Sequence, residues 1–429
     1  MPQQVHQKVF LISCILVAFF MPVVPKFIPA VIALMFLNWI TSGIYLSTVP
    51  RLFSEKWRIR TLSFSALYLF YAAGMLYTTN YTYGWFDLEV KLSLLVFPVI
   101  FATSDLEILT RAGRKPVIEA FVAGCIAGSL LFLGHTIIVN VQAGVRDSFY
   151  YTNLSWYFHP SYLAMYCVFG LNIVMISLFR DFSRLAPASR TGLFLVALYL
   201  EGFIFLLSSK AGLALLAITG ALFVALMCFK KTGLKRVVLV SALMVTVFVA
   251  FALVFPFAFS RVADTRSVVS PSGTVQTNFE NGSVARVALW KVSLKQIREN
   301  FLFGTGTGDV QDAFLSACLQ GKLMVVYSKK LNSHNQYFQT FITLGVFGFG
   351  LLVASLLIPA WQSFRKRNYL YFIFLVIFLV NIMVESMLET QAGVVFYAFF
   401  NVLLFSGGGV VSSKERLQPE EQDATLSTS

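Results

Sequence analysis

Two histidines stand where polar residues interrupt a largely apolar sequence. His334 lies in NSHNQYFQTFITLG and His159 lies in YFHPSY. An unperturbed imidazole has a pKa of about 6.5, so it takes up and releases protons near neutral pH, as a general base must. Both segments also fit simpler roles. Asn332 or Ser333 is a suitable helix cap, and the tyrosines around His159 suit an aromatic belt at a membrane surface.

Two basic residues occur at similar boundaries. Lys210 lies in LLSSKAG, where a very short connection between two apolar stretches brings it to the membrane surface, and Arg286 lies near the start of an amphipathic segment. Cations and helix N-termini together bind phosphate or pyrophosphate, because free N–H groups and the helix dipole are positive there. Lysine also snorkels to a membrane surface without a further role. Whether these positions meet depends on how the helices pack.

Acidic residues and cysteines offer no recognisable metal site. Glu385 and Glu389 stand near the outer end of an expected membrane span, where an ionisable residue is a functional candidate and a hydrated structural role is equally reasonable. Asp309 and Asp312 fit a helix start, and the cysteines show no CxxC or Cys/His spacing. The run GTGTG at 304–308 lacks the GK[ST] of a phosphate loop. We expect no metal and no cofactor, and a plain turn at GTGTG.

The composition shows which medium surrounds these residues. Of 429 residues, 57% are hydrophobic and only 12% are charged, whereas a soluble domain carries about 25% charged residues. The apolar residues come in blocks of about 17–25, enough for a helix to cross a ~30 Å hydrocarbon core. The alternation typical of a membrane barrel is absent. The net charge of +13 therefore indicates basic cytoplasmic loops, with no nucleic acid as partner.

The sequence predicts an all-α, polytopic membrane protein with about 12 transmembrane helices. Basic residues concentrate in every second connection, which places the N-terminus in the cytoplasm. We expect transmembrane helices one to nine within 1–257, a periplasmic loop at 258–335, helices ten to twelve within 336–410, and a disordered cytoplasmic tail at 411–429. The spans are expected near 9–25, 28–48, 62–79, 88–104, 116–139, 160–179, 191–207, 210–229, 237–257, 336–360, 369–385 and 392–410.

The long outer loop is expected to contain short amphipathic helices. Apolar residues recur at intervals of three and four from Val287 to Phe301, which predicts a helix with one apolar face. Such a helix lies on a membrane surface or covers the end of a bundle. Asp309 is a suitable N-cap for a second helix through Cys318. The first part of the loop, residues 264–283, is rich in Ser, Thr, Asn and Gly and predicts a mobile coil.

A set of motifs follows in a fixed order after about residue 150. They are FHPSYLAMY, SSKAGLALL, ARVALWKVSLKQIRENFLFGTGTGD, SHNQYFQTFITLGVFGFG and ESMLETQAGVVFYAFF. In these motifs the chain resembles the O-antigen ligase and O-antigen polymerase superfamily. The resemblance implies a metal-independent, inverting glycosyltransferase of the inner membrane, which takes a glycan from undecaprenyl pyrophosphate at the periplasmic face. Ligases pass the glycan to a lipid A core sugar, and polymerases pass it to another repeat unit.

The resemblance also implies roles for individual residues. Arg286 matches the loop arginine of the family and His334 matches its catalytic histidine. Lys210 falls where many members have arginine, so the position keeps its positive charge but loses the bidentate fork. The other expected contacts to the pyrophosphate or the glycan are His159, Asn335, Trp290 and Tyr337.

Other classes of function compete with an enzyme. A glycan or lipid transporter without chemistry predicts discontinuous helices in two related halves, and no paired Gly/Pro interruptions occur. A scaffold or sensor needs a cytoplasmic output domain, and the expected cytoplasmic loops are short. We therefore expect a ligase whose partners are a lipid-linked glycan donor, a lipid A core or other glycan acceptor, and membrane lipid. A polymerase is the first alternative, and a ligase that glycosylates proteins is another.

Overall fold

The computed structural model describes residues 2–104, 111–143, 149–229, 233–255, 282–321 and 323–415. Within these ranges every regular element is a helix, which confirms the all-α fold. The α-helices are α1 (Gln3–Val23), α2 (Ile28–Ser42), α3 (Ile44–Thr48), α4 (Lys56–Leu62), α5 (Ala66–Gly74), α6 (Tyr81–Lys91), α7 (Ser93–Thr103), α8 (Arg111–Ala143), α9 (Pro160–Asp181), α10 (Pro187–Leu206), α11 (Lys210–Phe229), α12 (Leu234–Val254), α14 (Gly282–Glu299), α15 (Val310–Gln320), α16 (Met324–Ser328), α17 (Gln336–Arg365), α18 (Tyr369–Asn381) and α19 (Gln391–Glu415).

Nine helical segments in the described ranges are long and apolar enough to cross a membrane, which makes the chain a multi-pass membrane protein. They are Gln3–Val23, Pro25–Ser42, Lys56–Tyr77, Gly113–Gln142, Pro160–Arg180, Pro187–Leu206, Lys210–Phe229, Val237–Val254 and Gln336–Arg365. The other expected spans, near 88–104, 369–385 and 392–410, contain the shorter helices α7 and α18 and the apolar part of α19. The expected number of about 12 spans stays a prediction.

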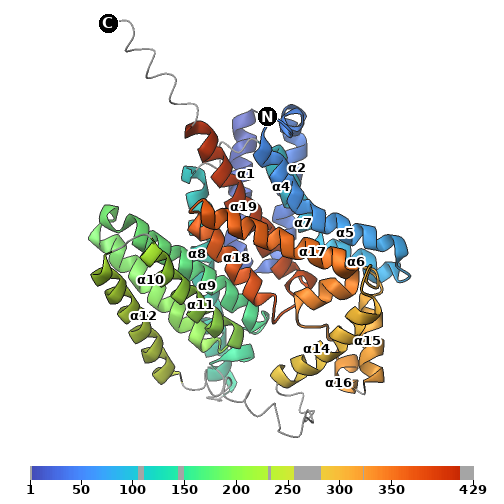
Figure 1. Ribbon diagram of the computed structural model, residues 1–429. Coiled ribbons are helices and arrows are strands. Elements are labelled where there is room, and N and C mark those ends of the chain that lie inside the picture. The colour runs from blue at the N-terminus through green and yellow to red at the C-terminus, as the bar shows by residue number, and fades with distance from the viewer. Residues whose placement is uncertain are drawn as a thin grey trace, which may run out of the picture.

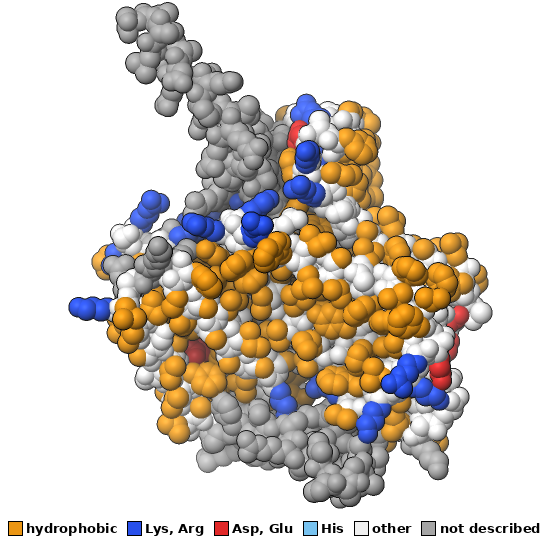
Figure 2. Space-filling model, in the orientation of Figure 1, with side chains coloured by type: hydrophobic (Ala, Val, Ile, Leu, Met, Phe, Trp, Pro, Cys, Tyr) orange, Lys and Arg blue, Asp and Glu red, His pale blue; other side chains and the backbone are white. Residues whose placement is uncertain are grey.

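The helices form a bundle with its hydrophobic side chains both inside and outside. Phe121 of α8, Phe169 of α9, and Phe396 and Phe400 of α19 pack ring against ring in the interior. Figure 2 shows a broad hydrophobic band across the middle of the visible face, with lysines and arginines above and below it. Apolar residues on both surfaces of a helix are expected where lipid replaces water as the solvent.

The loop helices lie at one end of the bundle. In Figure 1, α14, α15 and α16 lie at the end opposite the N-terminus. Asp309 precedes α15 as expected, but its carboxylate does not cap that helix. It accepts hydrogen bonds from the main-chain N–H groups of Thr79 at 2.8 Å and Asn80 at 2.7 Å. Partial burial raises the pKa of the Asp309 carboxyl group, but these hydrogen bonds outweigh it and hold the pKa below its usual value. The carboxylate thus fixes the loop to the start of α6.

A break in α17 joins this helix to the turn after α14. Gly345 has φ 64° and ψ −162°, a conformation that only glycine adopts without strain. Main-chain atoms of the turn replace the helical bonds lost there: Val346 N donates to Phe301 O at 2.9 Å, and Thr305 N donates to Ile342 O at 2.8 Å. A Cβ on Gly304 would lie 2.4 Å from main-chain atoms of α17. The glycine-rich segment is therefore a close-packed turn, as expected.

Two predicted segments, the coil at 264–283 and the tail at 411–429, lie at the edges of the described ranges. The predicted coil at 264–283 lies outside the described residues except for 282–283, which begin α14. Helix α19 continues to Glu415, so the start of the expected disordered tail is helical, while 416–429 lie outside the described residues.

Candidate active site

The carboxylate of Glu385, in the segment between α18 and α19, is the centre of a polar cluster. Arg286 Nη2 donates to Glu385 Oε1 at 2.5 Å, and His334 Nδ1 lies 3.2 Å from Oε2. Ser161 Oγ donates to Oε1 at 3.3 Å, and His159 Nδ1 lies 3.8 Å from the same oxygen. Glu385 itself is only 4% exposed. The fold therefore gathers segments that are far apart in the sequence around one buried carboxylate.

These partners determine the charge of Glu385. Burial alone raises the pKa of a carboxyl group, because it disfavours the charged form. Here the hydrogen bond from His334 and the positive charge of Arg286 outweigh burial and hold the pKa of Glu385 below its usual value. The carboxylate is therefore ionised at neutral pH. A negative charge fixed next to an imidazole favours the N–H form of the ring nitrogen that faces it.

The backbone around His334 is unusual. Its φ is +46°, in the left-handed region that side-chain-bearing residues rarely adopt and that often occurs at functional sites. Asn332 Oδ1 accepts from His334 N at 3.0 Å, which stabilises this turn. The cap of α17 is Asn335, which accepts from Phe338 N at 3.2 Å, instead of the expected Asn332 or Ser333. The turn and the cap together direct the imidazole toward Glu385.

The starts of α9 and α11 lie side by side at this cluster. His159 is the N-cap of α9, and its Nδ1 accepts from Ser161 N at 3.4 Å. Ser209 Oγ donates to Ser161 Oγ at 3.4 Å. A Cβ on Gly212 would lie 2.6 Å from Ala164 Cβ, so the two helices approach closely. Lys210 follows Ser209 as the first residue of α11.

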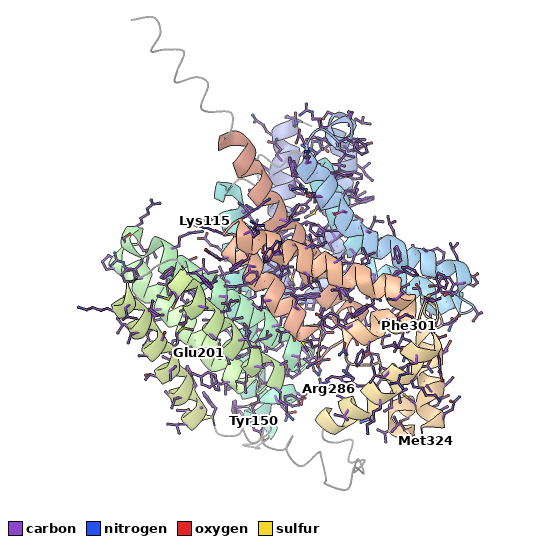
Figure 3. All side chains as sticks on the ribbon, in the orientation of Figure 1. Lys115, Tyr150, Glu201, Arg286, Phe301 and Met324 are labelled. Carbon is purple, nitrogen blue, oxygen red and sulfur yellow. The ribbon has the colours of Figure 1, made fainter. Side chains whose placement is uncertain are left out.

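Helix α14 contributes two side chains one turn apart. Arg286 and Trp290 lie four residues apart, so they share one face of the helix. Arg286 Nε and Trp290 Nε1 are buried and have no hydrogen-bond partner among the described residues. Buried N–H groups are nearly always bonded, so this pair offers two donors to an acceptor-rich group. Figure 3 labels Arg286 near the end of α14 that faces the rest of the bundle.

Asn335 and Tyr337, expected to bind substrate, are occupied by the fold. Asn335 is 7% exposed and serves as the cap of α17. The Tyr337 hydroxyl donates to Leu379 O of α18 at 3.2 Å. Of the expected site residues, Arg286 and His334 contact one carboxylate and His159 lies 3.8 Å from it. Trp290 is one helical turn from Arg286, and Lys210 follows Ser209 in the sequence. Glu385 was considered only as an ionisable residue near bilayer depth, and its place at the centre was not predicted.

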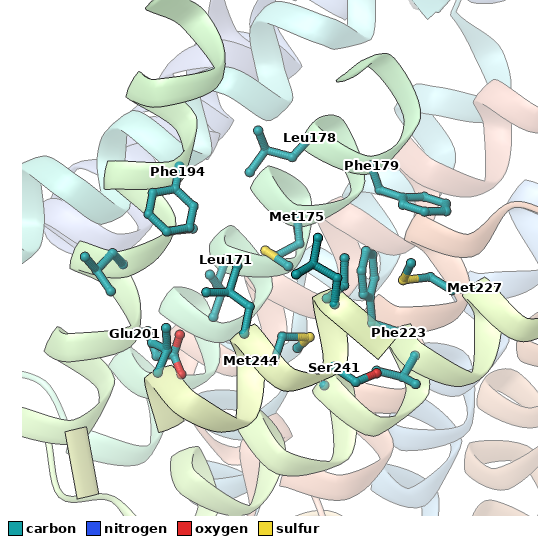
Figure 4. A pocket seen from close by; sticks show the side chains of 18 of the residues that line it. Leu171, Met175, Leu178, Phe179, Phe194, Glu201, Phe223, Met227, Ser241 and Met244 are labelled. Atoms are coloured by element: carbon teal, nitrogen blue, oxygen red, sulfur yellow. The ribbon is translucent and has the colours of Figure 1, made fainter. Parts of the chain in front are cut away.

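A large cavity lies elsewhere in the molecule. A cavity of about 1280 Å³ lies between α9, α10, α11 and α12, and apolar side chains form most of its wall. Figure 4 shows Glu201 of α10 among them. We place the candidate site at Glu385 because titratable groups converge there. In the part of the chain that the structure describes, no group of three or more His, Cys, Asp and Glu is arranged to hold a metal ion.

The fold and the cluster define a helical, multi-pass membrane protein with a polar site at the starts of its helices. Residues 193–353 match the family described as O-Antigen ligase. This match supports membership of the O-antigen ligase superfamily and a ligase- or polymerase-type function, with a lipid-linked glycan and an acceptor as partners in general. The matched part includes Lys210, Arg286 and His334, while His159 and Glu385 lie outside it. A search of curated proteins finds no match to the chain.

Proposed function

We propose that the chain is an O-antigen ligase-like glycosyltransferase. It moves a glycan from undecaprenyl pyrophosphate to the hydroxyl of a lipid A core sugar, at the periplasmic face of the inner membrane and without a metal ion. The observation that carries this proposal is the shared contact of Arg286 and His334 with the carboxylate of Glu385. It places a permanent cation and a proton acceptor together, which are the two groups that this transfer needs.

In this proposal His334 is the general base and Glu385 orients it. Glu385 accepts from Nδ1–H of the imidazole, so Nε2 carries the lone pair. Nε2 takes the proton of the acceptor hydroxyl while its oxygen attacks the anomeric carbon, and the bond to the pyrophosphate breaks with its electron pair. A single displacement of this kind inverts the anomeric configuration. The carboxylate stabilises the imidazolium that forms, as the aspartate does in serine hydrolases.

Arg286 then acts on the leaving group. A guanidinium stays protonated at any working pH, so it binds phosphate but cannot serve as a base. One of its nitrogens holds Glu385, and its buried Nε has no partner among the described residues. The Trp290 N–H one turn away is a second donor for a pyrophosphate or sugar oxygen. Lys210, at the start of α11, adds a charge beside a helix N-terminus.

Transfer of labelled lipid-linked glycan by the purified protein tests these roles, with donor binding measured separately. His334→Ala should leave donor binding nearly intact and lower the rate on the order of 10²–10⁴-fold, the usual effect of losing a general base. The matched control is His6→Ala, because His6 pairs with Asn38 far from the cluster in sequence. Full activity of His334→Ala removes the histidine from the mechanism.

The product that accumulates in a deletion strain separates the ligase from its alternatives. Free lipid-linked polymer is the result expected for a ligase. Single lipid-linked repeats indicate a polymerase instead. Lipid-linked glycan retained on the cytoplasmic side of the membrane indicates a transporter and contradicts the enzyme proposal.

A further inference from the structure

A second buried polar cluster involves the segment that carries Glu385. Lys91, the last residue of α6, is fully buried. Its ammonium donates to Asp87 and lies 3.2 Å from Glu389 Oε1. It also lies 4.6 Å from the centre of the Tyr71 ring. One lysine thus faces two carboxylates, and Asp87 Oδ2 has no hydrogen-bond partner among the described residues. Burying these charges is costly, which calls for a role beyond packing.

Gln336, the first residue of α17, connects this cluster to the candidate active site. Its Nε2 donates to Glu389 Oε1 at 3.2 Å, and its Oε1 accepts from Leu388 N at 2.7 Å. Its main-chain N donates to Ile382 O at 2.8 Å. These bonds fix both ends of segment 382–389 against the start of α17. Glu385 lies within this segment, and the start of α17 directly follows the turn that carries His334.

We propose that Lys91 is a positioning residue for the transfer reaction. By holding Glu389 it fixes segment 382–389, so that Glu385 meets His334 and Arg286 in the observed geometry. Without the ammonium, the buried carboxylates of Asp87 and Glu389 lose their counter-ion and the segment shifts away. A displacement of about 1 Å at a catalytic group costs on the order of 10²-fold in rate. This inference rests on the proposed function, since it concerns the same site.

Steady-state transfer by the full chain tests the role of Lys91 through the separate changes in kcat and KM. Lys91→Met should lower kcat on the order of 10–100-fold and leave KM for the donor nearly unchanged, because Lys91 does not touch the donor. Lys91→Arg should restore most of kcat, since it keeps the charge. The matched control is Lys115→Met, which removes a lysine paired with Glu119 at the same four-residue spacing but 74% exposed. It should behave as wild type.

A neutral variant separates positioning from folding. Lys91→Met combined with Asp87→Asn and Glu389→Gln removes every charge of the cluster, so it should unfold near the wild-type temperature even if Lys91→Met alone does not fold. Its kcat should stay about tenfold low, because the bond from Lys91 to the segment is still missing. Recovery of wild-type kcat in this variant overturns the proposal, and so does a loss in Lys91→Met that the folded fraction fully explains.

Amide hydrogen exchange tests the same inference without a measurement of activity. Amides of segment 382–389 should exchange faster in Lys91→Met than in wild type or Lys115→Met, because the segment is released. If the amides of segment 382–389 exchange at the same rate in Lys91→Met as in wild type, the positioning role is contradicted even if transfer is observed. If wild type itself shows no transfer, the proposed function fails, and faster exchange still supports the role of Lys91 in holding the segment.

Discussion

Glu385 and Glu201 are two acidic residues in opposite surroundings. Glu385 is held by an arginine, a serine and a histidine from other parts of the chain, and His159 lies 3.8 Å away. Glu201 faces the large apolar cavity between α9 and α12, and no hydrogen bond or ion pair to it is found among the described residues. A charged carboxylate is expensive in an apolar site without partners and tolerable with them. This difference is the reason for placing the candidate site at the convergent polar groups and not at the cavity.

The largest expected effect follows from neutralising the partnered carboxylate. Glu385→Gln keeps the shape of the side chain but removes the charge that orients His334 and stabilises its protonated form. Transfer should fall on the order of 10²–10⁴-fold, as after loss of the base itself. Glu201→Gln, measured in the same assay, is the matched control. A larger loss in Glu201→Gln would move the active centre to the cavity and reverse the comparison.

Removing the cation at Glu385 should have the next largest effect. Arg286→Ala should weaken donor binding and lower turnover on the order of 10²-fold, the effect of losing one donor to a developing charge. Arg286→Lys should restore it only in part, because an ammonium lacks the planar fork. Arg298→Ala removes an exposed arginine of the same helix and should have little effect. Normal donor binding in Arg286→Ala would exclude the pyrophosphate role.

The dependence of stability on pH sharpens the comparison further. Because the folded state lowers the pKa of Glu385, its ion pairs contribute fully above the unfolded value of about 4.3. That contribution is lost as the pH falls through the lower, folded value. Wild type should therefore exceed Glu385→Gln by about 1–3 kcal/mol near neutral pH, and the difference should shrink below about pH 4. Thermal unfolding in detergent measures it, and a difference that grows in acid contradicts the assignment.

A smaller effect of opposite sign is expected at the cavity. Glu201→Leu replaces a carboxyl group in apolar surroundings by a side chain of similar size, so it should stabilise the protein on the order of 1 kcal/mol. Its transfer activity should match wild type. Thermal unfolding measures the change in stability, and the transfer assay measures the activity. Destabilisation together with lost transfer would show that Glu201 has partners in the working protein.

The smallest effect is expected from removing metal ions. The proposed chemistry uses Arg286 as the cation and His334 as the base, so EDTA should leave transfer unchanged. The assay is repeated after chelation and after adding magnesium or manganese. Activity that is lost with EDTA and restored by either ion would assign the leaving-group charge to a metal and reduce the role of Arg286.

Local sequence patterns predicted the helix starts that carry two of the candidate residues. Proline after His159 places the histidine at a helix start, and this is where the structure has it. The short connection before Lys210 likewise predicts the start of α11. The cap of α17 was assigned wrongly, because Asn332, Ser333 and Asn335 are all good caps and the left-handed turn at His334 decides between them. The substrate contact of Tyr337 stays a prediction, and the structure adds that its hydroxyl donates to a carbonyl of another helix.

The sequence by itself determined the solvent, the helices and the residue types, because apolar length, capping and charge patterns act over a few neighbouring residues. Only the tertiary structure decided that Arg286, His334 and Ser161 meet at Glu385, and that Lys91 pairs with Glu389. Such contacts join positions up to hundreds of residues apart, and each depends on the packing of whole helices. A buried carboxylate reveals its role only when its partners are seen, since the partners set its charge.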